Sequence, residues 1–181
     1  GLSHDTPPHA INYRANLKAL ECLGVKRVLA VNAVGSISEE ISPLDLVLLS
    51  DFIDFTSNRE STFLGGGKQG VEHVDMSSPY CPYLRKSLLD LAPNFDLSIH
   101  SRGVYVCTNG PRLESPAEIK MFALLGGDVV GMTGLPEVVL AKELGLCYAA
   151  VAFSINWAAG IQESVEFVSD SSGLDRMRRN L

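Results

Sequence analysis

The sequence has few basic residues and no long apolar run, and these two absences exclude several classes of protein. Its 181 residues include 15 Lys or Arg against 21 Asp or Glu, for a net charge of -6. Binding to a nucleic-acid backbone needs clustered basic residues, so no nucleic-acid partner is expected. The longest apolar run, Leu146–Phe153, is strand-sized and far shorter than a membrane span of about 20 residues. With neither a secretory signal nor a basic tail, the sequence predicts a soluble, cytoplasmic protein without a membrane partner.

Motifs for metals and nucleotide cofactors are also missing. The four cysteines show no C-x-x-C spacing, so they are expected to be reduced packing residues, with neither a disulfide nor a zinc site. The four histidines contain no i, i+4 pair, which gives no support for a metal site. The small-residue segment Asn32–Ser36 lacks both the dinucleotide fingerprint and the phosphate loop of ATP-binding proteins. We therefore expect no metal and no organic cofactor.

Helix and strand patterns alternate along the chain and predict its fold. Apolar residues at three- and four-residue steps predict a helix over Pro8–Cys22, followed by a strand over Val25–Val31 that ends in a loop at Asn32–Ser36. Further strands are expected at Leu46–Leu49, Val104–Thr108, Val129–Met132 and Cys147–Ile155, and further helices at Tyr83–Leu91, Pro116–Leu125 and Pro136–Leu144. This order predicts one α/β domain with three layers and a largely parallel sheet, whose site lies at the carboxyl ends of strands.

One long segment, Asp54–Ser78, has no periodicity. It contains three consecutive glycines, Gly65–Gly67, together with the polar residues Arg59, Glu60 and His73. Loops of this length inside a compact domain are usually functional or mobile. We consider this loop a candidate to reach a neighbouring subunit.

A strand-to-helix junction holds the first candidate site residue, Glu114. The expected strand ends in the turn Gly110–Pro111, and Ser115 follows as a favourable N-cap. Pro116 suits the first helical position, and Glu118 completes a capping box with Ser115. The junction therefore fixes Glu114, which either contacts a ligand or only complements the helix dipole.

Small residues after two strands are candidates for holding an anion. At Asn32–Ser36 the backbone N–H groups can approach an anion closely and Ser36 adds a hydroxyl, although an ordinary tight turn has the same pattern. Thr133 follows a buried strand and either contacts phosphate or caps the next helix.

The last strand ends at Asn156, whose amide both donates and accepts hydrogen bonds. Beside a purine it can donate to a 6-oxo oxygen or to N7, while Glu114 accepts the N1 proton. Hypoxanthine and guanine fit this pair. A 6-amino purine presents an acceptor at N1, and a buried mismatch of this kind discriminates strongly.

Together these residues resemble the trimeric purine nucleoside phosphorylases and the related methylthioadenosine and methylthioinosine phosphorylases. The likeness runs from Gly1 to about Gly160. It is carried by Pro8–Asn16, Asn32–Ser36, Gly110–Glu118 and Met132–Glu143. The resemblance implies a three-layer, phosphorylase/hydrolase-like α/β fold with a twisted mixed sheet flanked by helices. It also implies a homotrimer or dimer of trimers, and phosphate as co-substrate without any other cofactor.

The resemblance also implies a set of site residues. Those near the nucleoside are Ala33, Gly35, Leu113, Glu114, Met132, Asn156, His73 and His4, and those near phosphate are Asn32, Ala33 and Thr133. Glu114 and Asn156 are the residues expected to be catalytic and to contact the purine. Met132 is expected under the ribose. His73 is expected to reach across a subunit boundary toward the 5′ end of the nucleoside, with His4 near the same region.

Two departures from the family pattern shape the expected function. Methylthioadenosine phosphorylases have Asp at the positions of Asn156 and Ala158, so this chain is expected to favour 6-oxopurines. The family's Arg-His pair before Gly1, and a glycine-rich phosphate-binding segment further upstream, are not in this sequence. We therefore expect either a piece of a longer protein or a shortened relative that binds phosphate poorly.

The expected reaction is phosphorolysis of inosine, guanosine or 5′-methylthioinosine. The alternatives are a methylthioadenosine phosphorylase, a hydrolytic nucleosidase and a non-catalytic purine-binding subunit.

Overall fold

A single seven-stranded sheet organises the computed structural model, which describes residues 5–65, 72–95 and 98–162. Its strands are β1 (Arg27–Ser36), β2 (Leu46–Leu48), β3 (Asp51–Asp54), β4 (Ile99–His100), β5 (Val104–Cys107), β6 (Val129–Gly131) and β7 (Cys147–Trp157). The helices are α1 (Tyr13–Cys22), α2 (Pro82–Leu91), α3 (Pro116–Leu124) and α4 (Glu137–Glu143), with short 3-10 turns at Pro8–Ala10 and Ala92–Phe95. Every helix and strand expected from the sequence is present, although β1, β2 and β3 follow one another without an intervening helix.

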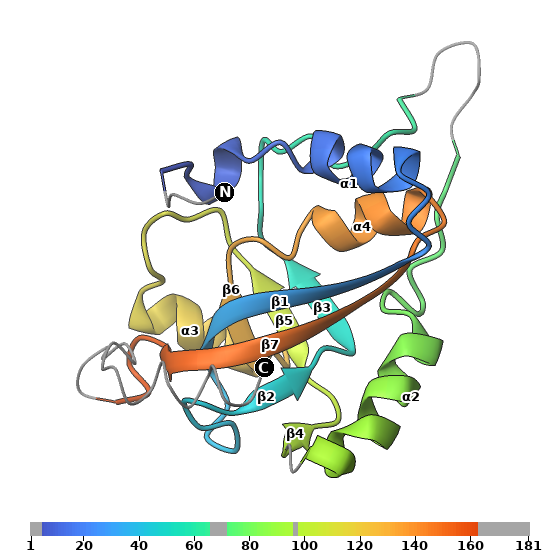
Figure 1. Ribbon diagram of the computed structural model, residues 1–181. Helices are drawn as coiled ribbons and strands as arrows, with labels where there is room; N and C mark the ends of the chain where they lie inside the picture. Colours follow the sequence, from blue (N-terminus) through green and yellow to red (C-terminus); the bar gives the residue numbers. More distant parts are fainter. Residues whose placement is uncertain (1–4, 66–71, 96–97, 163–181) are drawn as a thin grey trace.

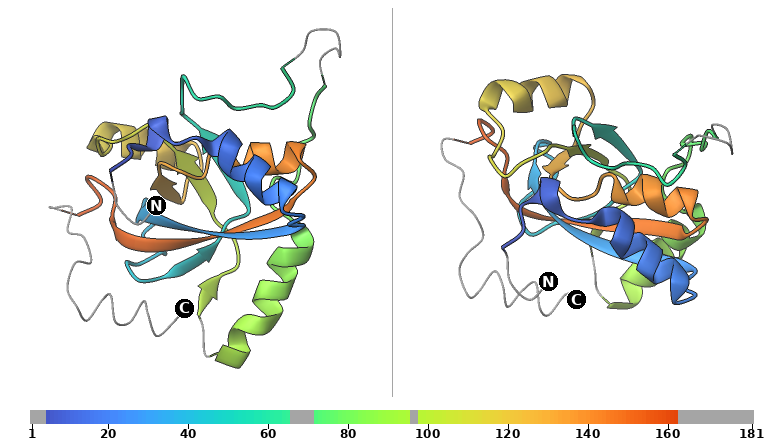
Figure 2. Two further views of the ribbon diagram at one scale, coloured as in Figure 1. Left: turned by 45° about the horizontal axis from the view of Figure 1, so that its top comes forward. Right: turned by 90° about the horizontal axis from the view of Figure 1, so that it is seen from above.

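The sheet is mixed and strongly curled, with strand order β3-β5-β6-β1-β7-β2-β4 (Figure 1). The pairings β1–β7, β2–β4, β3–β5 and β5–β6 are parallel, whereas β1–β6 and β2–β7 are antiparallel. Helices α1 and α4 pack against each other beside the sheet, and α2 and α3 lie at opposite ends of the molecule (Figure 2). This arrangement is the expected α/β fold with a twisted mixed sheet and flanking helices.

The segment Asn32–Ser36 is the second half of β1, so the expectation of a loop there was wrong. Asn32, Val34 and Ser36 are buried at alternate positions, as a strand requires, and β1 pairs with β7 along its whole length. A register shift between Val34 and Gly35 bends the strand. The small residues therefore bend a strand instead of ending it.

The first helix starts later than its apolar periodicity indicated. The Asn12 side chain accepts a hydrogen bond from the backbone N–H of Ala15, so α1 begins at Tyr13 and not at Pro8. Strands β3 and β4 were not expected. They have four and two residues, too few for an alternating pattern to stand out.

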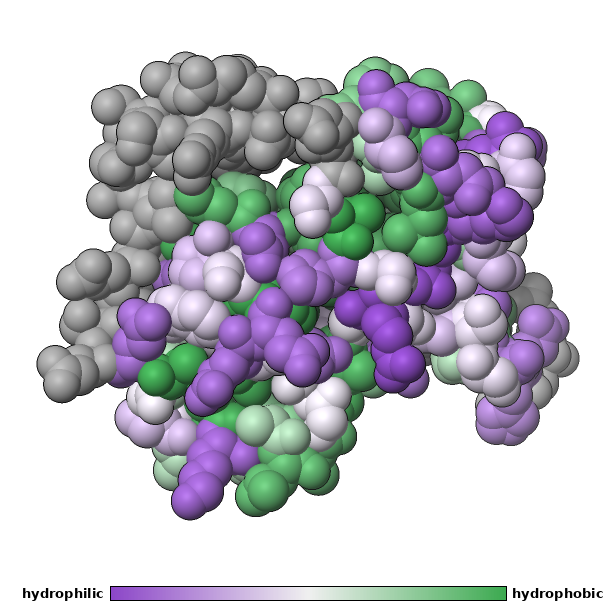
Figure 3. Space-filling model, turned by 90° about the horizontal axis from the view of Figure 1, so that it is seen from below, coloured by the Kyte–Doolittle hydropathy of each residue, from purple (hydrophilic) through white to green (hydrophobic). Residues whose placement is uncertain are grey.

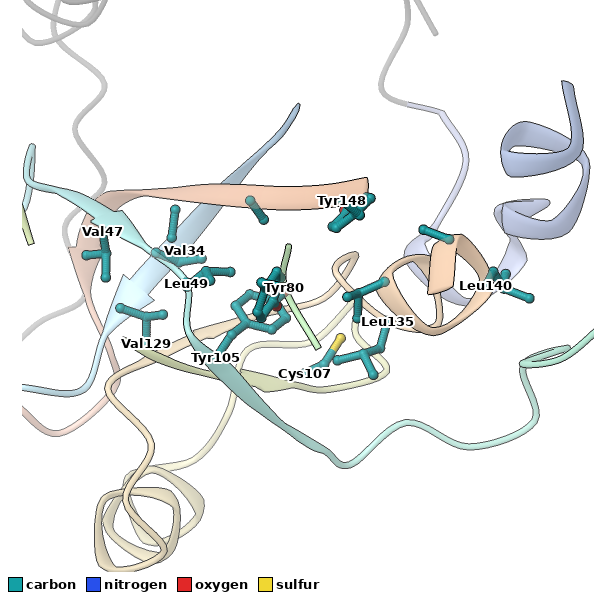
Figure 4. Close-up of a cluster of buried hydrophobic side chains, with 14 of the residues drawn as sticks. Val34, Val47, Leu49, Tyr80, Tyr105, Cys107, Val129, Leu135, Leu140 and Tyr148 are labelled. Atoms are coloured by element: carbon teal, nitrogen blue, oxygen red, sulfur yellow. The ribbon is translucent and has the colours of Figure 1, made fainter. Parts of the chain in front are cut away.

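The main core lies between the sheet and the helix pair α1 and α4. Figure 4 shows Tyr105 in the middle of this cluster, with Val34 and Leu49 on one side and Leu135 on the other. All four are almost completely buried. A second cluster, which includes Val106, Ile119, Phe122, Val130 and Ala158, holds α3 against the sheet. The two clusters fix the ends of β5 and β6, where the expected site lies.

A disulfide joins Cys81, at the start of α2, to Cys147, the first residue of β7. Their Cα atoms are 5.2 Å apart, within the usual range for a disulfide. The expectation that all cysteines are reduced was therefore wrong. The two cysteines are 66 residues apart in the sequence, and no local spacing pattern predicts such a pair. The free cysteines are Cys22, which is exposed, and Cys107, which is buried.

The surface mixes polar and apolar residues. On the face shown in Figure 3, hydrophobic patches are separated by hydrophilic side chains. Within the described residues, the first part of β1 pairs only with β7, and its side chains Leu29 and Val31 are each 52% exposed. Among the described helices, none has the length and apolar character needed to cross a membrane.

Candidate active site

The carboxyl ends of β5 and β6 lie side by side, and the two loops that follow them form the candidate site. Cys107 pairs with Gly131 at these ends. The β5–α3 loop is residues 108–115, and the β6–α4 loop is residues 132–136. Gly110 has φ +59°, and a Cβ there would lie 2.4 Å from Sδ of Met132. The loops are therefore in close contact, at a point where only glycine fits.

Glu114 is held at the mouth of α3 by Thr108, whose hydroxyl donates to Oε1 over 2.6 Å. The predicted capping box is confirmed, because Ser115 accepts from the Glu118 N–H while Glu118 accepts from the Ser115 N–H. Hydrogen bonds from Arg112, and then from the Ser115 backbone, lower the pKa of Glu118 to about 2. Glu118 thus complements the helix N-terminus, and Glu114 has a different partner.

Asn156 lies near the end of β7, paired with Gly35 of β1 and only 5% exposed. Its Nδ2 donates to the Trp157 carbonyl oxygen over 2.7 Å. Beyond β7, Gly160 packs so closely on Pro116 that a Cβ would lie 2.6 Å from the Pro116 Cβ. The chain after Asn156 therefore returns to the start of α3, and the structure brings Asn156 and Glu114 to one end of the sheet.

Asn32 lies in the middle of β1, beside the β6–α4 loop. It is 5% exposed, and a Cβ at Gly134 would lie 3.3 Å from its Nδ2. Within the described part of the chain, this buried Nδ2 has no hydrogen-bond partner. Its neighbour Ala33 is exposed. Asn32 and Thr133 therefore lie on adjoining segments, and Asn32 carries a donor that nothing in the described chain satisfies.

Tyr105 supports the β6–α4 loop from inside the core, a role that sequence reasoning missed. Its hydroxyl accepts from the N–H groups of Thr133 and Gly134, at 3.2 and 3.1 Å. The side chain is fully buried, and burial raises the pKa of Tyr105 well above its usual range. A tyrosine in an apolar strand needs a partner for its hydroxyl, and this need was the available signal.

A partly buried carboxyl lies at the start of α4. Glu137 accepts a hydrogen bond from the Tyr148 hydroxyl over 2.6 Å. Burial raises the pKa of Glu137, and it also raises the pKa of Tyr148. The pair joins α4 to the beginning of β7.

The remaining predicted site residues are less enclosed. Leu113 is 46% exposed on the β5–α3 loop, and His73 is exposed on the long loop. His4 lies outside the described residues. Among the residues that the structure describes, no three His, Cys, Asp or Glu side chains gather as a metal site would require.

A hollow of about 250 Å³ lies between the start of α1 and the segment Asn58–Glu60, and its lining includes His9, Arg14 and Arg59. None of the predicted site residues lines it. The hollow is therefore lined by residues other than those predicted for the site.

The sequence model of the phosphorylase superfamily matches residues 2–178. This chain belongs to the phosphorylase superfamily. Within the superfamily it is 53% identical, over 164 residues, to a probable 6-oxopurine nucleoside phosphorylase of Moorella thermoacetica, a match covering 91% of this chain and 63% of that protein. It is 54% identical, over 164 residues, to a probable S-methyl-5′-thioinosine phosphorylase of Methanopyrus kandleri, covering 90% of this chain and 63% of that protein.

A solved structure supports the same placement. Methylthioadenosine phosphorylase from Schistosoma mansoni, in complex with tubercidin, superposes with a TM-score of 0.88 at 33% identity, covering 98% of this chain and 70% of that one. The chain spans 63% of the length of each of the two relatives named above, somewhat less than two thirds.

Proposed function

We propose that the protein catalyses phosphorolysis of 6-oxopurine nucleosides, releasing free purine and a ribose 1-phosphate. The observation that carries this proposal is the presence of Glu114 and Asn156 at one end of the sheet, next to the loop that bears Thr133. Relatives about half identical in sequence are named as 6-oxopurine nucleoside or methylthioinosine phosphorylases, which supports the same substrate class.

In the proposed base site, Glu114 accepts the N1 proton of hypoxanthine or guanine. A carboxylate accepts at both oxygens; Thr108 occupies Oε1, and we assign N1–H to Oε2. Asn156 turns its amide from the Trp157 carbonyl to donate to N7 or O6. Adenine has no proton at N1, so Glu114 would face a lone pair and binding would weaken.

In the proposed reaction, phosphate attacks C1′ while the bond from C1′ to purine N9 breaks and its electrons pass to the purine. The transition state has oxocarbenium character, as in glycoside hydrolysis. Asn156 stabilises negative charge on the departing purine, and the phosphate dianion stabilises the ribosyl cation. We assign Asn32, Ala33 and Thr133 to phosphate, because Asn32 Nδ2 is a buried donor that an oxyanion would satisfy. Met132 and Leu113 then adjoin the ribose and the base.

We further propose that the protein is a homotrimer in which His73 approaches the 5′ end of a neighbour's nucleoside. His73 is exposed on the long loop, where a neighbouring subunit can be reached. Mixing His73→Ala with Glu114→Ala subunits should restore activity above either variant alone, since mixed trimers rebuild some intact sites. Absence of recovery despite proven subunit exchange would remove His73 from the neighbouring site.

Turnover of inosine, guanosine, 5′-methylthioinosine and 5′-methylthioadenosine, with and without phosphate, tests the function. We expect phosphate-dependent turnover with a preference for 6-oxopurines. Base release without phosphate would indicate a hydrolytic nucleosidase. Binding of hypoxanthine without turnover would indicate a binding subunit, and a preference for methylthioadenosine would contradict the assigned base site.

Glu114→Gln tests the base site itself. Losing the charged acceptor should lower kcat/KM for inosine about ten- to hundredfold, from a lost interaction of roughly 1.5–3 kcal/mol. Glu118→Gln is the matched control, because glutamine preserves the capping box at the same helix. Asn156→Asp should shift preference toward 6-amino substrates. Equal losses in the Glu114 and Glu118 variants would contradict the assignment of Glu114.

A further inference from the structure

Arg59, on the segment between β3 and α2, reaches behind both loops of the candidate site. Its Nη2 donates to the carbonyl oxygens of Thr108 and Asn109, at 3.2 and 3.1 Å. Its Nη1 donates to the carbonyl oxygen of Leu135 and, at 3.3 Å, to the Tyr13 hydroxyl. One guanidinium thus bridges the β5–α3 loop, the β6–α4 loop and helix α1.

Tyr13 holds the guanidinium in place. The Arg59 Cζ lies 5.5 Å from the centre of the Tyr13 ring, a cation–π arrangement, and Tyr13 is only 4% exposed. The Tyr13 hydroxyl donates to the Pro8 carbonyl oxygen over 2.8 Å. Burial raises the pKa of Tyr13 to about 12, although Arg59 acts to lower it, so Tyr13 stays neutral and able to donate.

A second contact joins the same two segments. Asn109 Nδ2 donates to the Ser57 hydroxyl over 2.9 Å, and the Ser57 N–H donates to Asn109 Oδ1 over 3.1 Å. On the other side of Arg59, Glu143 of α4 anchors the segment by accepting from the Thr62 hydroxyl and the Phe63 N–H. Arg59 therefore extends from a segment that is fixed on both sides of it.

We propose that Arg59 is a positioning residue that sets the separation between the purine-binding and phosphate-binding ends of the site. This inference rests on the proposed function. Toward the purine, Arg59 holds the Thr108 carbonyl, and the Thr108 hydroxyl holds Glu114.

Toward the phosphate, Arg59 holds the Leu135 carbonyl, two residues beyond Thr133. Because its hydrogen bonds are charge-assisted and its geometry is planar, the guanidinium can fix both loops at once. Lysine carries a point charge without this forked geometry and should not replace it.

Arg14 provides a matched control. It lines the same hollow and braces the same segment, with Nη1 3.2 Å from Glu60 Oε1 and Cζ 5.4 Å from the centre of the Phe63 ring. These partners lie on the segment and not on either site loop. Arg14→Met should therefore loosen the segment without separating the two loops.

The test compares wild type, Arg59→Met, Arg59→Lys and Arg14→Met in the intact protein. Without any ligand, amide hydrogen exchange in residues 108–115 and 133–135 should be at least about tenfold faster in Arg59→Met than in wild type or Arg14→Met, because charged hydrogen bonds are lost. With inosine and phosphate, kcat/KM should fall about ten- to hundredfold in Arg59→Met and remain within about threefold in Arg14→Met. In Arg59→Lys, kcat/KM should recover less than half of the loss seen in Arg59→Met, measured on a logarithmic scale. If Arg59→Met does not fold, Arg59→Lys is compared with wild type in its place.

Unchanged exchange in the Arg59 variants would overturn the inference. So would equal losses of activity in Arg59→Met and Arg14→Met, or faster exchange with unchanged turnover. If wild type neither turns over nor binds any 6-oxopurine, the proposed function fails, and the exchange comparison then decides separately whether Arg59 holds the two loops.

Discussion

Removing the disulfide tests how the chain is stabilised around its site. The double variant Cys81→Ala/Cys147→Ala releases a closed loop in which the bonded residues are 66 apart. Without the disulfide the unfolded chain gains conformational entropy, and this lowers the free energy of unfolding by about 4 kcal/mol at room temperature. For a protein of this size, that difference lowers Tm by about 8–16 °C.

The folded state should change little. The Cys81 N–H donates to the Tyr148 carbonyl oxygen over 2.7 Å, and this backbone contact between α2 and β7 does not need the sulfur atoms. We therefore expect the double variant to keep its activity at low temperature. Its urea m-value should rise, because the unfolded chain is no longer cross-linked and exposes more surface.

Urea and thermal unfolding followed by circular dichroism measure both effects, with Cys22→Ser as control because Cys22 is a free, exposed cysteine. Wild type in reductant should behave like the double variant. A Tm change no larger than that of Cys22→Ser would refute the reasoning, as would loss of activity with unchanged stability.

Three further changes act on single contacts. Because burial raises the folded-state pKa of Glu137 above its unfolded value, its contribution to stability is present at low pH and is lost as pH rises through the folded pKa. Urea unfolding should therefore show wild type losing stability relative to Glu137→Gln as pH rises from about 4 to neutral, and a pH-independent difference would contradict this. Glu118 acts in the opposite direction. Its pKa of about 2 in the folded protein lies below the ordinary value of about 4.3, so its contribution to stability is present above the ordinary value and is lost as the pH falls toward 2. Glu118→Gln should flatten this fall in stability at acid pH. Gly110→Ala should destabilise the fold by about 1–3 kcal/mol and reduce turnover, since the added methyl group clashes with Met132. Gly126→Ala is the control: Gly126 has φ +87°, so alanine is strained there too, but the added methyl group has no atom within 4 Å. Equal effects of the two alanines on turnover would rule out the contact between the loops as the cause.

Local patterns predicted the regular elements and the junction at Glu114 well. The capping box at Ser115 and Glu118 is formed by residues three positions apart, so the start of α3 could be predicted from the local sequence alone. The segment Asn32–Ser36 was misread because its small residues are typical of a loop, whereas pairing with a strand more than a hundred residues away decides its conformation.

The supporting residues could not be predicted because their partners are distant in sequence. Arg59 contacts carbonyl groups on two separate loops, and Tyr105 contacts backbone N–H groups nearly thirty residues away. Backbone atoms leave no signature in the amino-acid sequence. The pair Cys81 and Cys147 was missed for the same reason, since only the folded chain brings the two residues together.

Trp157 gives the protein an optical reporter of its own. It is the single tryptophan of the sequence, and its carbonyl accepts the hydrogen bond from the Asn156 amide. Within this sequence, tryptophan emission therefore originates from one position, at the end of β7 where the purine is proposed to bind. A purine that draws the Asn156 amide away from Trp157 changes the surroundings of that indole, so titration with hypoxanthine can be followed by intrinsic fluorescence without a label.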